Sequence, residues 1–262
     1  MTAEELAAAG LRYDVDGPVA TITLARPEVR NAQTPAMWRA LASLGDGIGD
    51  DVRVVVVRGE GRTFSAGLDR AMLAPGGGDG RETVAGLLAL DDAAMSATID
   101  DYQRGFTFLR DPRFVSVAAV QGHAVGAGFQ LALACDLRVV ADDALLCMKE
   151  SALGLVPDLT GTKPLVESVG YARALEICVT ARMVGADEAV AIGLATTAVP
   201  AEELDATVAD LVAALTAPMP GVVTETKALL QSAVHADLDE QRRREREAQV
   251  RRFRELAAVL GG

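Results

Sequence analysis

A glycine-containing turn between two apolar segments is the first feature of this chain that could do chemistry. The stretch "QGHAVGAGFQLALACDLR", residues 121–138, interrupts a strand-like run and resumes as a short apolar helix. Backbone N–H groups at the start of such a helix can bind a negatively charged atom. The first polar side chain of the helix is Gln130, an amide that cannot act as a general base at physiological pH. Any proton transfer at this turn therefore needs another residue.

A second turn of the same kind, "FSAGLD" at residues 64–69, follows another apolar run. Each turn places a small residue, Ala66 or Ala127, where the backbone can approach a ligand closely. Two N–H donors that converge on one oxygen form an oxyanion hole. A single turn is equally consistent with the ordinary need for glycine between a strand and a helix, but the pair favours the oxyanion hole.

The elements that position these turns alternate between strands and helices. Residues 19–25 alternate apolar and polar positions as a half-buried strand does, with Asn31 beyond them as the expected cap of a helix over residues 34–47. The β-branched run "VRVVVVRGEG" is typical of a buried parallel strand, and similar units recur at residues 114–122 and 137–147. The pattern predicts an α/β fold with crossover connections, followed after residue 200 by three helical segments.

Composition excludes several classes of protein. The 262 residues are 50% hydrophobic and 24% charged, as in a soluble globular protein, and the longest apolar runs are too short to span a bilayer. The net charge of −12 argues against nucleic acid or an anionic membrane as a partner. Three cysteines and two histidines predict neither a disulfide framework nor a metal site. The first twelve residues lack a signal-peptide pattern, so we expect a cytoplasmic protein.

The chain resembles the crotonase superfamily, also called the enoyl-CoA hydratase/isomerase family, along nearly its whole length. The resemblance rests on "LARPEVRNA", "FSAGLD", "VQGHAVGAGFQLALACDLRVVADDALLCMKESALGLVPD", "RALEICVTARMVGADEAVAIGLA" and "KALL". It implies a spiral of ββα units over residues 1–199 and a helical region at 200–262 that assembles homotrimers or homohexamers. It also implies an acyl-CoA thioester as substrate, with no further cofactor, and an acyl pocket walled by residues 72–101.

The same resemblance assigns roles to the turn residues. In proteins similar to this one, two backbone N–H groups hold the thioester carbonyl, and those positions are taken here as Ala66 and Ala127. The neighbouring residues are expected to bind the substrate: Arg26, Arg30, Ser65, Gly67, Leu68, Asp69 and Gly126. Arg70 is a further basic group near these loops, although a salt-bridge role is at least as consistent for each of the three arginines.

Hydratases of this family resemble one another in having two glutamates, whose positions are Gln130 and Glu150 here. Glutamine can hold a water molecule but cannot deprotonate it. A single carboxylate suffices to shift a double bond from the β,γ to the α,β position, because it returns the proton that it removes. We therefore expect an enoyl-CoA isomerase with Glu150 as the proton carrier. Without the resemblance, Glu150 would be interpreted as a surface carboxylate paired with Lys149.

Asp158 leaves alternatives open. Dienoyl-CoA isomerases and aromatic acyl-CoA dehalogenases that resemble this chain have an aspartate near this position, but "PDLTGT" is also a good helix-capping signal. If Asp158 and Glu150 line one pocket, each raises the pKa of the other. The alternatives to isomerisation are hydration with a water held by Gln130, decarboxylation or thioester hydrolysis assisted by Asp158, and a non-catalytic acyl-CoA-binding subunit.

Overall fold

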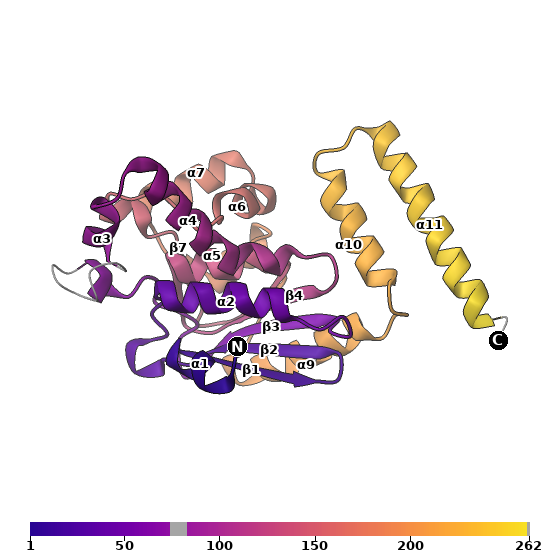
Figure 1. Cartoon of the computed structure of the whole chain (residues 1–262), viewed down its shortest axis with the longest axis horizontal. Helices are drawn as coiled ribbons and strands as arrows, with labels where there is room; N and C mark the ends of the chain where they lie inside the picture. Colours follow the sequence, from indigo (N-terminus) through magenta and orange to yellow (C-terminus); the bar gives the residue numbers. More distant parts are fainter. Residues whose placement is uncertain (74–82, 261–262) are drawn as a thin grey trace.

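A six-stranded sheet with helices packed on both faces forms the framework of the main body, and Figure 1 labels its strands β1 to β4. The computed structural model describes residues 1–73 and 83–260; residues 74–82, within the segment predicted to wall an acyl pocket, lie outside the described residues. The strands of this sheet, in spatial order, are β1 (Leu11–Asp16), β2 (Val19–Leu24), β3 (Val54–Gly59), β4 (Val115–Val120), β6 (Leu137–Ala141) and β9 (Thr197–Val199). Among the described strands of this sheet, β1 and β2 pair in antiparallel fashion and the other neighbours pair in parallel.

The chain passes from strands of the large sheet into a second, smaller sheet. It contains β5 (His123–Val125), β7 (Leu145–Cys147) and β8 (Val184–Gly185). β4 therefore leads into β5 and then a helix, and β6 leads into β7, so the segment predicted as one unit at residues 137–147 is two strands in different sheets. The repeated strand–strand–helix order confirms the predicted α/β fold with a helical C-terminal region.

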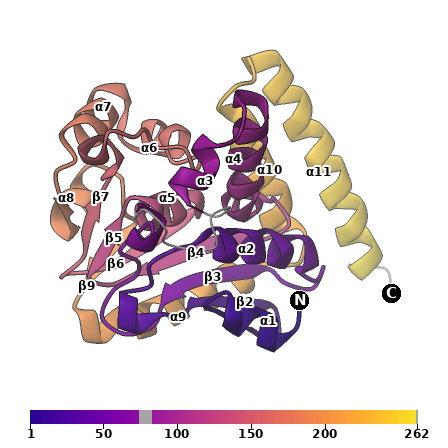
Figure 2. The same ribbon diagram turned by 60° about the vertical axis from the view of Figure 1, so that its left-hand side comes forward.

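The two faces of the large sheet carry separate apolar clusters. β4 is buried at all six positions and β3 at five of six, because parallel strands covered on both faces need apolar side chains on both. Helices α2 (Pro35–Gly47) and α4 (Asp92–Thr107) cover one face (Figure 2), whereas α9 (Leu204–Thr216) packs Leu204 and Val208 on the other. The remaining helices of this part are α1 (Ala3–Ala8), α3 (Val84–Leu88), α5 (Ala127–Ala134), α6 (Thr162–Val169), α7 (Tyr171–Thr180) and α8 (Ala186–Ala191).

Short 3-10 helices connect several of these elements. They are η1 (Pro27–Val29), η2 (Arg70–Leu73), η3 (Phe108–Arg110), η4 (Glu150–Leu153) and η5 (Ala201–Glu203). The helix predicted over residues 34–47 is α2, but its cap is Thr34, whose hydroxyl accepts the Met37 N–H at 3.3 Å. Asn31 was the wrong choice because its side chain is fully buried, where its Nδ2 donates to the Thr63 carbonyl oxygen at 2.7 Å.

The last two helices, α10 (Val222–Ala233) and α11 (Leu238–Leu260), stand beside the main body as a hairpin (Figure 1). Lys227 attaches α10 to that body: its buried Nζ donates to Asp136 Oδ2 at 2.7 Å and to the Phe114 carbonyl oxygen at 2.8 Å. The boundary predicted between residues 199 and 200 falls between β9 and η5, and an oligomerisation role beyond it stays a prediction. Within residues 1–73 and 83–260, no helix has the length and apolarity needed to cross a membrane.

Candidate active site

The two glycine-containing turns predicted to act together lie against each other. Ser65 and Ala124 form a parallel β-bridge, and the Val125 N–H donates to the Ser65 carbonyl oxygen at 3.0 Å. Gly67 has a φ of +87°, and a Cβ there would overlap the Val125 carbonyl oxygen and lie 3.5 Å from the Ala127 nitrogen. Glycine is thus required for the turns to meet.

The prediction that Ala66 supplies an oxyanion donor is wrong. The Ala66 N–H donates to the Arg30 carbonyl oxygen at 2.9 Å, so it is already engaged. Among the described residues, the N–H of Leu68 has no acceptor, and neither has that of Ala127, which opens α5. The turn therefore leaves Leu68, two residues later, beside Ala127 as the available pair of donors. Sequence reasoning named Leu68 only as a substrate contact because residue size does not show which N–H a turn leaves free.

Ser65 holds the first turn in shape rather than facing a ligand. Its hydroxyl is fully buried, donates to the Asn31 carbonyl oxygen at 2.7 Å and accepts from the Gly67 N–H at 3.2 Å. Gln33, which sequence reasoning missed, donates to the same hydroxyl at 3.1 Å and accepts the Trp38 indole N–H at 2.8 Å. A buried Gln just before the N-cap of α2 carries no motif, so only its partners reveal this role.

Of the three arginines near the turns, one forms an ion pair and two are exposed. Arg26 pairs with Asp69 at 3.0 Å and also donates to the Ala32 carbonyl oxygen at 2.7 Å, which ties the segment after β2 to the first turn. Arg26 thus takes the salt-bridge role. Arg30 and Arg70 are exposed and have no ion pair within the described part of the chain. A substrate contact stays a prediction for both.

Glu150 is a buried carboxylate at the first position of η4, with 8% of its surface exposed. Its Oε1 accepts the Gln130 Nε2–H at 2.7 Å, and no group of residues 1–73 and 83–260 binds its Oε2. A Cβ on Gly126, which precedes α5, would lie 3.3 Å from Glu150 Oε1, so the carboxylate adjoins the second turn. Glu150 is therefore not the surface partner of Lys149.

Burial raises the pKa of Glu150, and the negative charge of Asp158 raises it further. The hydrogen bond from Gln130 acts in the opposite direction because it favours the ionised carboxylate. A carboxylate that is buried, partly hydrogen-bonded and raised in pKa is a stronger base than an exposed one, as a group that removes and returns a proton requires.

Asp158 lies in the turn before α6, near enough to Glu150 for its charge to matter. It does not cap the helix: α6 begins at Thr162, and its N-cap, Gly161, has no side-chain cap. The capping interpretation is therefore wrong. Although the side chain is open to solvent, the surrounding protein desolvates the carboxyl and raises the pKa of Asp158. The structure thus supplies a second acid, but a more exposed one than Glu150.

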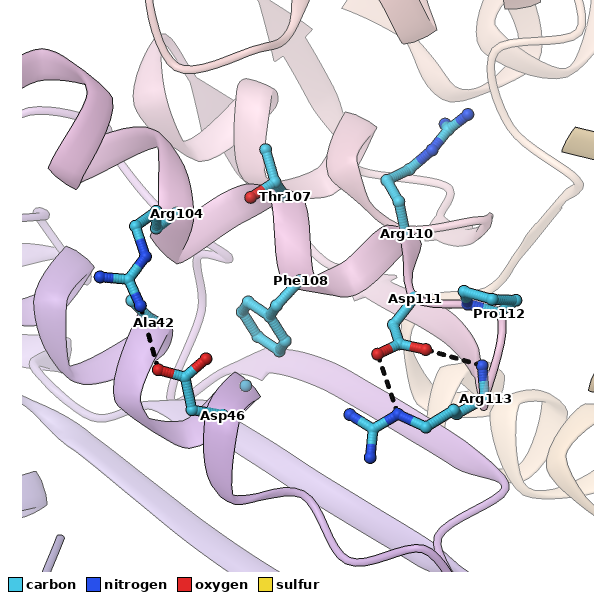
Figure 3. Close-up of a pocket in the computed structure, with 10 residues that line it drawn as sticks. Ala42, Asp46, Arg104, Thr107, Phe108, Arg110, Asp111, Pro112 and Arg113 are labelled. Carbon is cyan, nitrogen blue, oxygen red and sulfur yellow. Dashed lines mark hydrogen bonds and ion pairs between the residues drawn. The ribbon is translucent and has the colours of Figure 1, made fainter. Parts of the chain in front are cut away.

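A hollow in the described surface lies away from these turns. It has a volume of about 660 Å³ and is lined by the ends of α2 and α4, by η3 and by the residues that follow (Figure 3). Its charged lining is already paired: Arg104 contacts Asp46 at 3.0 Å, and Arg113 contacts Asp111 at 2.9 Å. None of the predicted site residues lines it, so the chemistry is assigned by the turns and Glu150 rather than by cavity size.

With this geometry in place, comparison with known proteins decides the family. The family model described as enoyl-CoA hydratase/isomerase matches residues 14–259. The chain belongs to the enoyl-CoA hydratase/isomerase family. Its fold matches that of a protein from Thermobifida fusca YX, solved in complex with acetoacetyl-CoA, with a TM-score of 0.93 and 54% sequence identity over 97% of this chain and 98% of that one.

Curated members of the enoyl-CoA hydratase/isomerase family carry the names of two different activities. A "Probable enoyl-CoA hydratase" of Rhodobacter capsulatus is 35% identical over 72% of this chain and 68% of its own length. The human mitochondrial Delta(3,5)-Delta(2,4)-dienoyl-CoA isomerase is 34% identical over 82% of this chain and 66% of its own length. The names of these relatives agree on the family but divide between two reactions.

Proposed function

We propose that this protein is an enoyl-CoA isomerase that shifts a β,γ double bond of an acyl-CoA thioester to the α,β position. The observation that carries the proposal is the pairing of Glu150 with Gln130. One buried carboxylate has an oxygen without a partner in the described structure, and the residue beside it is an amide rather than a second base. The acetoacetyl-CoA bound to the Thermobifida relative supports an acyl-CoA ligand.

The reaction needs one base and one anion site. Glu150 Oε2 removes a proton from the carbon next to the thioester carbonyl, and the electron pair moves onto the carbonyl oxygen to give a dienolate. The N–H groups of Leu68 and Ala127 stabilise this oxygen, and each such donor contributes about 3–4 kcal/mol in comparable sites. Glu150 then returns the same proton to the γ-carbon, so the carboxylate ends ionised as it began.

The amide of Gln130 is poorly suited to hold the water that hydration requires. Its Oε1 accepts the Leu159 N–H at 2.9 Å and the Gly161 N–H at 3.2 Å, which uses both lone pairs of the oxygen. Its Nε2 donates to Glu150. This occupancy favours isomerisation by a single base over hydration with a water held by Gln130.

A second candidate uses both acids. The charge of Asp158 acts on Glu150, so the two carboxyls share one site, and a protonated acid beside an ionised base can assist hydration, decarboxylation, thioester hydrolysis or isomerisation of a dienoyl thioester. The kinship with a dienoyl-CoA isomerase is compatible with this arrangement. A non-catalytic binding subunit is the least supported alternative, because the base and both N–H donors are retained.

One experiment separates these functions. A panel of CoA thioesters, including β,γ-enoyl, α,β-enoyl and dienoyl species, is incubated with the purified protein in water enriched in ¹⁸O and followed by mass spectrometry. We expect an unlabelled isomer of the β,γ-enoyl substrate, and Glu150→Gln should slow its formation by about 100- to 10,000-fold. Uptake of ¹⁸O would instead establish hydration or hydrolysis, and binding without turnover would establish the non-catalytic subunit.

A further inference from the structure

The side chain of Gln130 joins two parts of the site that are distant in sequence. It is fully buried within α5, where its Nε2 lies 2.7 Å from Glu150 Oε1 and its Oε1 accepts hydrogen bonds from the Leu159 and Gly161 N–H groups. A Cβ on Gly161 would lie 2.7 Å from Gln130 Cγ, so the turn packs directly on the side chain. The amide thus spans the gap between η4 and the segment before α6.

Only one orientation of this amide is compatible with its neighbours. Rotating the amide by 180° would place the Nε2 donors against two backbone N–H groups and the Oε1 acceptor against the Glu150 carboxylate. Both exchanges replace attraction by repulsion in a buried site. Gln130 is therefore fixed, and it holds Glu150 Oε1 while leaving Oε2 for the reacting carbon.

The turn that Gln130 holds is also the one that carries Asp158. On its other side, Gln103 of α4 donates to the Asp158 carbonyl oxygen at 2.6 Å. Two amide side chains from two helices thus fix the backbone on both sides of residue 159. The separation of the Asp158 and Glu150 carboxyls depends on this pair of contacts, and only Gln130 touches Glu150 as well.

We propose that Gln130 is a positioning residue, a two-ended clamp that fixes the Glu150 carboxylate and the Asp158 turn in one arrangement. This inference rests on the proposed function in so far as Glu150 is the proton carrier. It assigns Gln130 a role different from that of a second base or a holder of water. The donor end aligns Glu150 and favours its ionised form, and the acceptor end holds residues 159–161.

The two ends of the clamp can be tested separately with two substitutions. Gln130→Met keeps the length of the side chain but removes both ends. Gln130→Glu keeps an oxygen that accepts from Leu159 and Gly161 but replaces the amide donor with a second carboxyl, whose like charge raises the pKa of Glu150. Gln121→Met is the matched control, because Gln121 also holds a turn, donating to the Gly59 and Gly61 carbonyl oxygens at 2.7 and 3.1 Å, but has no hydrogen bond to Glu150.

The measurements need no substrate. The ¹³Cδ resonance of Glu150, identified by its loss in Glu150→Gln, is titrated in each variant, and hydrogen exchange of the Leu159 and Gly161 amides is followed in parallel. In Gln130→Met we expect the Glu150 midpoint to rise and both amides to exchange at least about 10-fold faster. In Gln130→Glu the midpoint should rise while both amides stay protected. Gln121→Met should change neither.

Kinetics of the β,γ-enoyl-CoA reaction distinguish the positioning of Glu150 from a purely structural role of Gln130. In both Gln130 variants we expect the acid limb of kcat to move to higher pH and kcat at neutral pH to fall by about 10- to 100-fold, with a smaller change in KM. An unchanged Glu150 midpoint in a folded Gln130 variant would overturn the clamp. Wild-type protein without isomerase activity but with the expected midpoint shifts would overturn only the proposed reaction.

Discussion

At the scale of single residues, the burial of Glu150 lowers the stability of the folded protein when the carboxylate is ionised. Its pKa is raised in the folded protein, so the folded state binds the proton more tightly than the unfolded chain does. The contribution of this group to stability is therefore most favourable below the pKa of an unfolded glutamate, about 4.3, and is lost as pH rises through the raised folded value.

Glu150→Gln should consequently stabilise the protein at pH 8 while it removes activity. We expect the midpoint of thermal unfolding to rise by about 2–4 °C at pH 8, and by less at pH 5, where wild-type Glu150 is more often protonated. Calorimetry at both pH values measures the difference, with the exposed Glu28→Gln as control. Equal shifts at the two pH values would show that ionisation of Glu150 is not the cause.

Asp158→Asn tests how many acids the reaction uses. Removing the negative charge lowers the pKa of Glu150, so the acid limb of kcat/KM should move to lower pH. If Glu150 acts alone, the rate at neutral pH should stay within about threefold of wild type, whereas an essential second acid would cost at least about 100-fold. The pH profile of kcat/KM decides between the two.

At the scale of elements, the site depends on the close approach of α5 to the turn at residues 64–69. A Cβ on Gly128 would lie 2.6 Å from the Ser65 carbonyl oxygen and 2.7 Å from Ser65 Cβ. Gly128→Ala should therefore push the turns apart, lower the free energy of unfolding by about 1–3 kcal/mol and remove most activity.

Gly47→Ala is the matched control for this prediction. Gly47 also lies in a helix, the last turn of α2, but a Cβ there meets nothing within 4 Å. Alanine should be neutral or stabilising by up to about 1 kcal/mol at this position, with activity unchanged. Urea unfolding of both variants provides the comparison, and equal losses would show that the contact with Ser65 does not limit the packing.

At the scale of the whole molecule, the helical hairpin presents apolar surface that residues 1–73 and 83–260 leave exposed. On α11, an exposed row with helical spacing contains Val250, Phe253, Leu256 and Leu260. We propose that a second and third copy of the chain cover this face in a homotrimer, which pairs into a homohexamer.

Phe253→Asp should then weaken the assembly. Phe253 is 62% exposed in the single chain, and an aspartate in its place would bring an unpaired charge into the interface. Sedimentation at micromolar concentration should show wild type above 27.3 kDa and the variant shifted toward the monomer. Val15→Asp, at a 54% exposed position on the hairpin of β1 and β2, is the control and should leave the assembly intact. A monomeric wild type would contradict the proposal.

The sequence alone determined the family, the α/β class and the positions of the two turns, because these depend on local patterns. Apolar alternation, β-branched runs and glycine between strand and helix each restrict the backbone within a few residues, and the ordered motifs carry the resemblance along the chain. The three C-terminal helices were predicted for the same reason. Ala127 was selected from its turn, whereas Glu150 was selected through the family resemblance, and the catalytic roles of both await the experiments above.

Only the tertiary structure decided which polar groups are occupied. The Ala66 N–H is engaged by Arg30, Asn31 is buried against Thr63 rather than capping a helix, and Gln130 reaches two N–H groups about thirty residues away. Each of these facts is a hydrogen bond between segments that are distant in sequence. A residue type shows what a group can donate or accept, but only the folded chain determines which partner lies within about 3 Å of it.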